Sequence, residues 1–474
     1  MKEVLAEASA KPIPVKFFIR GELIEGAELE FSGRGGETTF VSANPSKLLN
    51  RIVLRDPQSM VSDFKGLKTS DIVDFLVALG EKLEFDRNPL MQEACRVSTL
   101  FSGLTPSILE GCYRRIPLVF SRPALESLVE NEVGINFLDG WVEVPVPLGR
   151  AKVRAYGAKT LHIIAGNVPL IAAISVIRGA LIKADNIIKL PSNDPLTATA
   201  ILTTMHEFDP GHPLVKHFVS VYWKGGDSRV ERPLITPQHL EKIIAWGGHN
   251  SVKHIKNLVG PGIDLITLDP KFSISVIGAE AFTSEDVMRQ AAGRAALDAG
   301  TFNQEACVNS RTQFVQTTPE KAARYGELLY QALQELHPSI STRPKHFPAH
   351  LRENLESLRY MYDFYHVAGG EKGEGAVVTS LTGDPVDFFP SCKVVNVIPF
   401  NEITEILPHI TVATQCVGIY PEPLKEALMD SLVAQGVQRF VSLGKATEGG
   451  IGVPSDAIEP MRRACKWIVN EIEA

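Results

Sequence analysis

The sequence predicts an α/β protein with a doubly wound parallel sheet, followed by a second α/β unit. Between residues 160 and 278, short apolar runs alternate with amphipathic helical stretches. This alternation is typical of parallel sheets, whose strands are buried on both faces. A second series of helix-like and strand-like segments begins after residue 278. Ligands of such sheets bind at the carboxyl ends of the strands, so the residues that follow the strands are the first candidates for a site.

The first 150 residues carry strand-like runs and then helical periodicity. Strands are expected at 16–20 and 38–41, on either side of a glycine-rich turn at 33–36, because no helical pattern follows those glycines. Apolar residues at helical spacing predict helices between 68 and 104, with Thr69 or Ser70 as a cap. These helices are expected to cover one face of the sheet that follows.

The expected strands and helices of the rest of the chain follow from its apolar periodicity. The parallel sheet should contain five strands, at 161–165, 186–190, 218–223, 243–246 and 264–268. The second unit should contain helices at 284–299, from 318 onwards, at 349–366 and at 458–470, and strands at 312–316, 376–381, 394–399 and 439–442.

Composition excludes several classes of protein. The 474 residues carry 55 acidic and 48 basic side chains, with no basic tail or stripe, so nucleic acid is not expected as a partner. The six cysteines form no CxxC pair and no cluster with histidine. We therefore expect neither a disulfide framework nor a metal site, and we expect a reducing cytoplasm. The start of the chain lacks the apolar stretch of a secretory signal, and the most apolar window, 161–177, is interrupted by polar residues, so no membrane span is expected.

Two helices that follow strands of the parallel sheet have recognisable N-terminal residues. Asn167 and Asp194 each stand just ahead of a proline, which suits a capped first turn. Backbone N–H groups at such corners bind anions. Taken alone, Asn167 is better explained as a helix cap with no further role. No GxGxxG or Walker A sequence is present, and the pairs Gly225-Gly226 and Gly247-Gly248 fit either a nucleotide or a tight turn.

One thiol stands apart from the periodic patterns. Cys307 lies in the segment TFNQEACVNSRT at 301–312, between a helix-like stretch that Gly300 can end and a strand-like stretch. A core cysteine more often lies inside an apolar pattern, where it packs as a small hydrophobe. Spacing alone leaves a catalytic nucleophile and a structural thiol both open.

Together these motifs resemble the aldehyde dehydrogenase superfamily and, within it, the LuxC-type acyl-CoA reductases, which make fatty aldehyde. AGNVPL at 165–170 is similar to the turn whose asparagine helps form an oxyanion hole, a role that falls on Asn167. NIIKLPSNDPLTA at 186–198 resembles the dinucleotide-ribose strand, with Lys189 at the position of the family's lysine. FNQEACVNSRTQFVQ at 302–316 resembles the nucleophile loop, and AWGGHNS at 245–251 resembles the turn beside the nicotinamide. The resemblance is specific over roughly 160–320 and looser over 390–470.

The resemblance implies an aldehyde dehydrogenase-like fold with a Rossmann-type cofactor domain and a second α/β catalytic domain. The expected divisions are 1–278 with the cofactor domain, 279–440 with the catalytic domain, and 441–474 returning to the cofactor domain or to an oligomer interface. A homo-oligomer and an acyl-transferring partner enzyme are expected by the same route. The implied site residues are Cys307, Asn167, Asp269 and Glu305 for catalysis, and Gly166, Lys189, Ser192, Trp246, Gly247, Gly248 and His249 for the cofactor.

Two departures from the hydrolytic relatives refine this expectation. Those enzymes commonly carry a ribose-binding glutamate three residues after the lysine, whereas this chain has Ser192. A carboxylate there would repel a 2′-phosphate by about 4 kcal/mol at 4 Å and an effective dielectric near 20, so we expect NADPH in preference to NADH. Where they carry a glutamate ahead of glycines, this chain reads TLDPKFS, and the nearest acid is Asp269. Asp269 is a shorter acid less suited to positioning water, or simply a turn residue that ends the strand.

The expected reaction is reduction of an acyl-CoA thioester through an acyl-cysteine. Thiolate attack by Cys307 gives an oxyanion held by the Asn167 amide and the Cys307 N–H, coenzyme A leaves, and hydride from NADPH yields the aldehyde. His249 is a candidate proton donor or phosphate contact, and Glu305 is a candidate acid or a solvated loop charge. The alternatives are a hydrolytic aldehyde dehydrogenase and a non-catalytic scaffold of the same fold.

Overall fold

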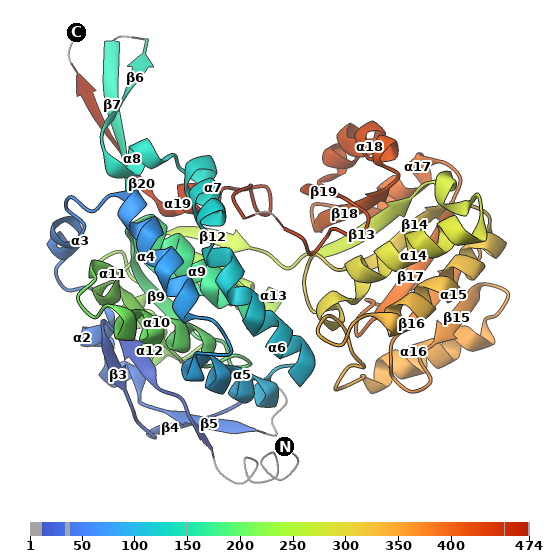
Figure 1. Ribbon diagram of the computed structural model, residues 1–474, viewed down its shortest axis with the longest axis horizontal. Coiled ribbons are helices and arrows are strands. Elements are labelled where there is room, and N and C mark those ends of the chain that lie inside the picture. Colours follow the sequence, from blue (N-terminus) through green and yellow to red (C-terminus); the bar gives the residue numbers. More distant parts are fainter. Residues whose placement is uncertain (1–11, 34–37, 148, 450, 473–474) are drawn as a thin grey trace. The chain divides into compact units, whose positions relative to one another are not determined.

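The computed structural model describes residues 12–33, 38–147, 149–449 and 451–472 and divides the chain into two compact units (Figure 1). Unit 1 contains the described parts of 1–102, 112–269 and 450–474, and unit 2 contains 103–111 and 270–449. Most of the glycine turn predicted at 33–36 and nearly all of the N-terminal segment lie outside the described residues. Each unit is built around its own sheet.

The main sheet of unit 1 confirms the predicted doubly wound core. Its strands, in spatial order, are β12 (Asp264–Leu268), β11 (Lys242–Trp246), β8 (Lys159–Ile163), β9 (Asp185–Lys189), β10 (Phe218–Val221), β2 (Phe17–Ile19) and β3 (Glu22–Ile24). The first five are parallel and coincide with the five predicted strands to within about two residues at each end. β2 and β3 add to the edge in antiparallel orientation.

The order of these strands defines where a ligand belongs. From β8 the chain proceeds through β9 to β10 on one side and later through β11 to β12 on the other. The loops that follow β8 and β11 therefore leave neighbouring strands toward opposite faces. In open α/β sheets, ligands bind at the carboxyl ends of the strands at such a switch point.

Helices pack on this sheet and on one another. α4 (Thr69–Lys82), α5 (Pro89–Phe101), α9 (Leu170–Leu181) and α10 (Thr197–Phe208) form a packed group (Figure 1). The predicted cap of α4 is wrong: Lys68 is the N-cap, and Thr69 instead donates through its backbone N and Oγ1 to Asp139, at 2.8 and 2.6 Å. The other helices of unit 1 are α2 (Leu49–Ile52), α3 (Gln58–Asp63), α7 (Arg122–Glu132), α8 (Ile135–Asp139), α11 (Pro213–Lys216), α12 (Ser228–Leu234), α13 (His249–Leu258) and α19 (Pro460–Ala464), and α6 (Pro106–Arg115) spans a unit boundary.

Two small sheets complete unit 1. One has the order β1 (Ile13–Pro14), β5 (Thr39–Ser42), β4 (Leu29–Ser32), and the other the order β20 (Lys466–Ile472), β7 (Gly149–Tyr156), β6 (Val142–Val146). The latter extends away from the rest of unit 1 (Figure 1). The helix predicted at 458–470 is wrong after Ala464, because β20 pairs with β7 along its whole length. This long-range pairing overrides the local helical pattern.

Unit 2 is built on a second, mostly parallel sheet. Its strands, in spatial order, are β15 (Tyr365–Gly369), β16 (Ala376–Ser380), β17 (Val394–Phe400), β14 (Ser310–Gln316), β13 (Phe272–Ile277), β18 (Thr414–Tyr420) and β19 (Arg439–Ser442). β13 lies between β14 and β18, so the boundary predicted after residue 278 falls on the wrong side of this strand. The helix predicted at 349–366 ends at Tyr360 as α16 (Ala349–Tyr360), because β15 pairs with β16 instead. The remaining helices are α14 (Glu285–Gly300), α15 (Pro319–Glu335), α17 (Ile403–Ile406) and α18 (Glu422–Gln435).

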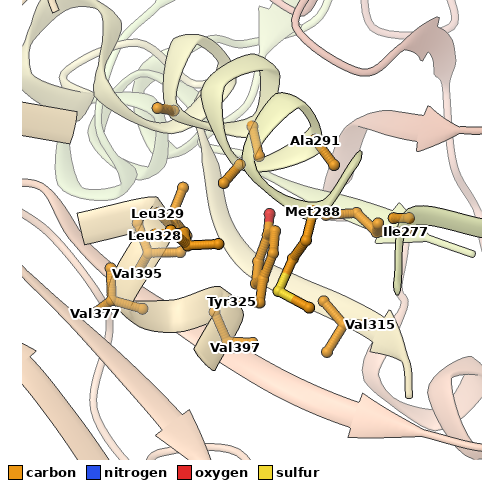
Figure 2. Close-up of a cluster of buried hydrophobic side chains, with 14 of the residues drawn as sticks. Ile277, Met288, Ala291, Val315, Tyr325, Leu328, Leu329, Val377, Val395 and Val397 are labelled. Atoms are coloured by element: carbon orange, nitrogen blue, oxygen red, sulfur yellow. The ribbon is translucent and has the colours of Figure 1, made fainter. Parts of the chain in front are cut away.

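The core of unit 2 holds β14 through Gln313 and Val315. Tyr325 of α15 lies among Met288, Val315 and Val397 (Figure 2), and alanines of α14 let that helix approach closely. The Tyr325 hydroxyl donates to Oε1 of buried Gln313 in β14 at 2.7 Å. Packing and this hydrogen bond together hold the strand that continues from Cys307.

Tyr325→Phe should lower the unfolding free energy by about 1–3 kcal/mol, because it leaves the buried Gln313 carbonyl without its donor. The measurement is the shift in the urea or thermal unfolding midpoint. Tyr362→Phe is the matched control, since Tyr362 is 73% exposed and should tolerate the same change. Equal midpoints for both variants would contradict the assigned hydrogen bond.

Candidate functional site

A cavity of about 560 Å³ lies in unit 1 at the carboxyl side of β8, β9 and β10. Two residues predicted for the cofactor, Lys189 and Ser192, line it. The other lining comes from β4, from the loop after β10, from α12 and from α13. The cavity thus occupies the edge of the sheet where the fold places ligands.

Lys189 is a half-buried cation in the wall of this cavity. It ends β9, and its Nζ lies over the rings of Tyr222 and Trp223, at 5.6 and 5.4 Å from their centroids. Burial lowers the pKa of Lys189 to about 8, an effect that nearby Glu231 opposes. At neutral pH the ammonium is therefore largely protonated, and its charge is lost as the pH rises through 8. It is suited to binding an anion in the neutral range.

A buried carboxylate that the sequence analysis missed lies beside Lys189. Glu231 is 2% exposed and accepts hydrogen bonds from Trp223 Nε1 at 3.1 Å and from the Gly226 backbone N at 3.1 Å. His254 Nε2 lies 2.8 Å from Glu231 Oε2, the oxygen that also accepts from the Gly226 N. These partners occupy the carboxylate, so Glu231 organises the cavity wall and the Gly225-Gly226 turn. The sequence signal that could have indicated Glu231 is its place shortly after Gly225-Gly226.

The turn after β8 is tightly packed against the loop after β9. A Cβ on Gly166 would lie 2.3 Å from Asn193 Oδ1 and 2.8 Å from Pro191 Cγ, so only glycine fits there. Pro169 occupies the N-cap position of α9, so the interpretation of Asn167 as its cap is wrong. Leu196 is the N-cap of α10, so the interpretation of Asp194 as its cap is also wrong, although Asp194 accepts from the Thr197 backbone N at 3.3 Å.

The turn after β11 leads into α13. Trp246 ends β11, Gly248 is the N-cap of α13 without a side-chain cap, and exposed His249 is the first residue of that helix. The same helix contributes Asn250 and His254 to the cavity lining. Gly247, Gly248 and His249 therefore adjoin the cavity without lining it, and backbone N–H groups of this first turn suit an anionic group.

Asp269 lies at the end of unit 1, after β12. Its carboxylate forms an ion pair with Lys256 Nζ of α13 at 3.2 Å, and its side chain is 43% exposed. This surface pair fits the interpretation of Asp269 as a residue that ends the strand. Exposed pairs of this kind contribute little to stability.

Cys307 lies in unit 2 on a loop with an unusual backbone. The loop follows a 3₁₀ turn, η4 (Thr301–Gln304), in which Phe302, Asn303 and Gln304 have φ values of 55°, 50° and 69°. The Gln304 side chain secures this turn by donating to the Val394 carbonyl at 2.9 Å and accepting from the Lys393 N–H at 3.1 Å. Three left-handed residues in succession are held only where surrounding contacts impose them, and such strain is common at functional sites.

Polar contacts hold the thiol loop from both sides. The Cys307 carbonyl accepts from Ser273 Oγ of β13 at 2.9 Å, and Ser273 Oγ in turn accepts from the Cys416 N–H at 3.1 Å. Asn309 accepts from the Ala306 N–H at 2.9 Å and donates to the Asp298 carbonyl at 3.0 Å. Cys307 is half-buried, unlike Cys416. A thiol that is held by its backbone but still accessible fits a nucleophile better than a core residue.

Arg311 is a cation near the thiol that the sequence analysis missed. Its guanidinium is buried, lies 4.7 Å from the Phe389 ring centroid, and donates to the carbonyls of Gln304 and Pro390, both at 2.7 Å. Burial lowers the pKa of Arg311, and its electrostatic interactions with Glu305, Cys307 and Cys392 oppose that shift. The arginine therefore ties the left-handed turn to a neighbouring loop and places positive charge near the thiol. Glu305 itself is exposed.

Asp298 joins the thiol loop to the segment after β19. Its carboxylate accepts from the backbone N–H groups of Gly444 and Ala446, both at 2.8 Å. Burial, only partly offset by these bonds, raises the pKa of Asp298 to about 6.

Within the described residues no group of three or more His, Cys, Asp or Glu side chains is arranged to hold a metal ion. No helix in the described part of the chain has the length and hydropathy needed to cross a bilayer.

Comparison with known proteins gives one family match over most of the chain. Residues 65–467 match the model of the family described as acyl-CoA reductase (LuxC). The chain is 27% identical to the long-chain acyl-protein thioester reductase of Aliivibrio fischeri over 419 residues, which is 87% of this chain and 84% of that protein. It is 26% identical to the enzyme of the same name from Photobacterium phosphoreum over 460 residues, or 95% and 90% of the two chains.

Solved structures share the fold at low sequence identity. An oxidoreductase from Marinobacter aquaeolei aligns with a TM-score of 0.73 at 13% identity, covering 96% of this chain and 98% of the other. An NADP-dependent glyceraldehyde-3-phosphate dehydrogenase from Bacillus halodurans, complexed with NADP, has a TM-score of 0.73 at 12% identity with the same coverage. Aldehyde dehydrogenase 21 of Physcomitrella patens has a TM-score of 0.71 at 13% identity, covering 98% and 99%. The predicted aldehyde dehydrogenase-like α/β fold is confirmed.

Proposed function

Because the chain belongs to the LuxC family of acyl-CoA reductases, we propose that it reduces a long-chain fatty acyl thioester to the aldehyde with NADPH, through an acyl group carried on Cys307. The observation that carries this proposal is the half-buried thiol on a loop fixed by Ser273, Asn309 and Arg311. Such a loop presents sulfur to an acyl carbon while its backbone stays in place.

The proposed chemistry runs in two steps. The Cys307 thiolate attacks the acyl carbon, the Asn167 amide and the Cys307 N–H hold the oxyanion, and the thiol of the donor leaves with a proton. A bound nicotinamide would supply one hydride to the carbon of the enzyme thioester. The carbon–sulfur bond then breaks, which releases the aldehyde and returns the thiolate. Glu305 and His249 are proposed as proton carriers. Asp269 is proposed to stand near the place of the water-activating glutamate of the hydrolytic relatives and to activate water poorly.

The residues of the unit 1 cavity suit an adenine dinucleotide. Lys189 would hold the adenosine ribose or its 2′-phosphate, Ser192 leaves room for that phosphate, and Lys224 adds a second cation to the lining. Glu231 is bound to Trp223 and Gly226 and so repels the phosphate less than an unpartnered carboxylate would. Gly166, Trp246, Gly247 and Gly248 are proposed to shape the turns around the rest of the cofactor.

The acyl donor is proposed to be a thioester of coenzyme A or of a protein. Two relatives carry the name long-chain acyl-protein thioester reductase, which favours a protein donor and an acyl-transferring partner enzyme. Exposed apolar residues on β20, Ile468 at 42% and Val469 at 57%, support a homo-oligomer formed through that strand. A reducing cytoplasm is proposed because the mechanism needs Cys307 as a thiol.

The test of this function is a steady-state assay with purified protein. Tetradecanoyl-CoA should drive NADPH oxidation with release of one aldehyde per NADPH, detected as a hydrazone. Oxidation of tetradecanal to the acid without coenzyme A would favour the hydrolytic alternative. Failure of every acyl thioester to react with Cys307 would favour a scaffold.

Ser192→Glu should raise the KM for NADPH by roughly tenfold to a hundredfold, because it restores a carboxylate near the 2′-phosphate and solvent screens part of the full ~4 kcal/mol repulsion. The KM for NADH should change little. Ser228→Glu is the control, since Ser228 is exposed at the start of α12 and does not line the cavity. A wild-type enzyme that prefers NADH would refute the cofactor assignment.

A further inference from the structure

A second cavity of about 560 Å³ lies in unit 1 at the amino ends of the parallel strands. Its wall includes Lys159, the first residue of β8, and Ile182 and Lys183, which lead into β9. The cofactor cavity lies at the carboxyl ends of the same strands, so the two are on opposite edges of the sheet. Nothing in the proposed reaction uses the second cavity.

The polar wall of this cavity carries an excess of positive charge. Five cations and two acids line it: Lys65, Arg154, Lys159, Lys183, Lys466, Asp139 and Glu241. Both acids already have partners. Asp139 pairs with Lys183 at 2.9 Å, and Glu241 pairs with Lys466 at 3.0 Å. The excess cations are therefore those of Lys65, Arg154 and Lys159.

Among these cations, Arg154 has a buried donor without a hydrogen-bond partner. Its guanidinium lies 4.7 Å from the Tyr156 ring centroid and makes no hydrogen bond to any described residue. Its Nε is buried without an acceptor. A buried donor without a partner is costly, and the planar guanidinium carries paired N–H groups in the geometry that a carboxylate fits. Lys159, by comparison, already donates through Nζ to the Gln238 carbonyl at 2.7 Å.

The rest of the wall is apolar. Met60 and Phe64 from the region of α3, Leu138 from α8 and Ile182 all line the cavity and are mostly buried. Val61, at its edge, is 63% exposed. An inorganic anion would leave this apolar wall unused, whereas an amphiphile with one anionic head and one hydrocarbon chain would satisfy both parts.

We propose that this cavity binds a long-chain fatty carboxylate, with the carboxylate on Arg154 and the hydrocarbon chain against Met60, Phe64 and Leu138. The head group receives two N–H donors from one guanidinium, and Lys65 lies in the same wall. The site does not depend on the proposed reaction, because it shares no residue with the cofactor cavity or the thiol loop.

The test is a titration of the full chain with tetradecanoate, measured by calorimetry and by displacement of a fluorescent fatty acid. Binding should weaken by about tenfold or more in Arg154→Leu, which keeps an apolar side chain but removes the head-group contact. Val61→Asp should also weaken binding by adding a carboxylate at the exposed edge. Arg150→Leu is the matched control, since Arg150 lies on the same strand but is 72% exposed and pairs with Glu143. It should bind as the wild type does.

Further comparisons separate this site from the others. Octanoate should bind more weakly than tetradecanoate, because less chain meets the apolar wall, and Cys307→Ser should leave binding unchanged. Unaltered affinity in Arg154→Leu, equal binding of octanoate and tetradecanoate, or displacement of tetradecanoate by NADPH would each overturn the proposal. So would wild-type protein that binds no fatty acid while Arg154→Leu changes its sedimentation, since the cavity would then be an interface between copies.

Discussion

Cys307→Ser should abolish acyl transfer and lower turnover by roughly 10⁴-fold or more, because a hydroxyl is a far weaker nucleophile than a thiolate at neutral pH. The fold should survive, since the loop is held through the backbone: Ser273 donates to the Cys307 carbonyl and not to its sulfur. The measurement is intact-protein mass spectrometry after incubation with tetradecanoyl-CoA in the absence of NADPH. Wild-type protein should gain the mass of one acyl group, and the variant should gain none.

The matched control for this experiment is Cys392→Ser. Cys392 is also half-buried and also interacts electrostatically with Arg311, so of the other five cysteines it is the one most similar to Cys307. It should retain acylation and turnover. Acylation that persists in Cys307→Ser, or disappears in Cys392→Ser, would move the nucleophile away from Cys307.

Asn167→Ala should lower kcat by about 10²–10³-fold, the usual effect of removing one oxyanion donor. Pro169, and not Asn167, occupies the N-cap position of α9, so the substitution removes no helix cap and should leave the unfolding midpoint unchanged. Single-turnover kinetics should show that acylation and hydride transfer both slow, because each passes through an oxyanion. The Kd for NADPH should stay the same.

Asn250→Ala is the control for this prediction, since Asn250 lines the cofactor cavity on α13. It should affect NADPH binding more than the rate of acylation. If Asn167→Ala raised the Kd for NADPH and left acylation unaffected, Asn167 would be a cofactor contact and the oxyanion donor would have to be sought elsewhere.

The sequence predicts most of the central sheet because local patterning and tertiary burial agree there. Strands β8 to β12 are short apolar runs between helices, and each was found within about two residues of its expected place. The two long helix errors share one cause. Residues 365–369 and 466–472 have helical neighbours in sequence, but their partners β16 and β7 lie elsewhere in the chain. Strand pairing of this kind leaves little local signal.

The residues of the candidate site also differ in whether local sequence reveals them. Cys307 and Lys189 are recognisable because their flanking residues resemble a family motif. Glu231 and Arg311 are not, because their roles arise from partners far away in sequence or in neighbouring loops: Arg311 reaches the Pro390 carbonyl, and Glu231 meets His254. Burial also changes the protonation behaviour of a residue in a way that the sequence does not show: the pKa of Lys189 falls to about 8.

The pairing of β20 with β7 has a consequence for synthesis on the ribosome. β7 emerges before any of residues 270–449, whereas β20 follows them, so the extended sheet of unit 1 stays incomplete until all of unit 2 has been translated. Domains usually fold in the order in which they emerge. Here the β20-facing edge of β7 stays unpaired until unit 2 has been translated, and an unpaired strand edge can pair with the wrong strand in the meantime.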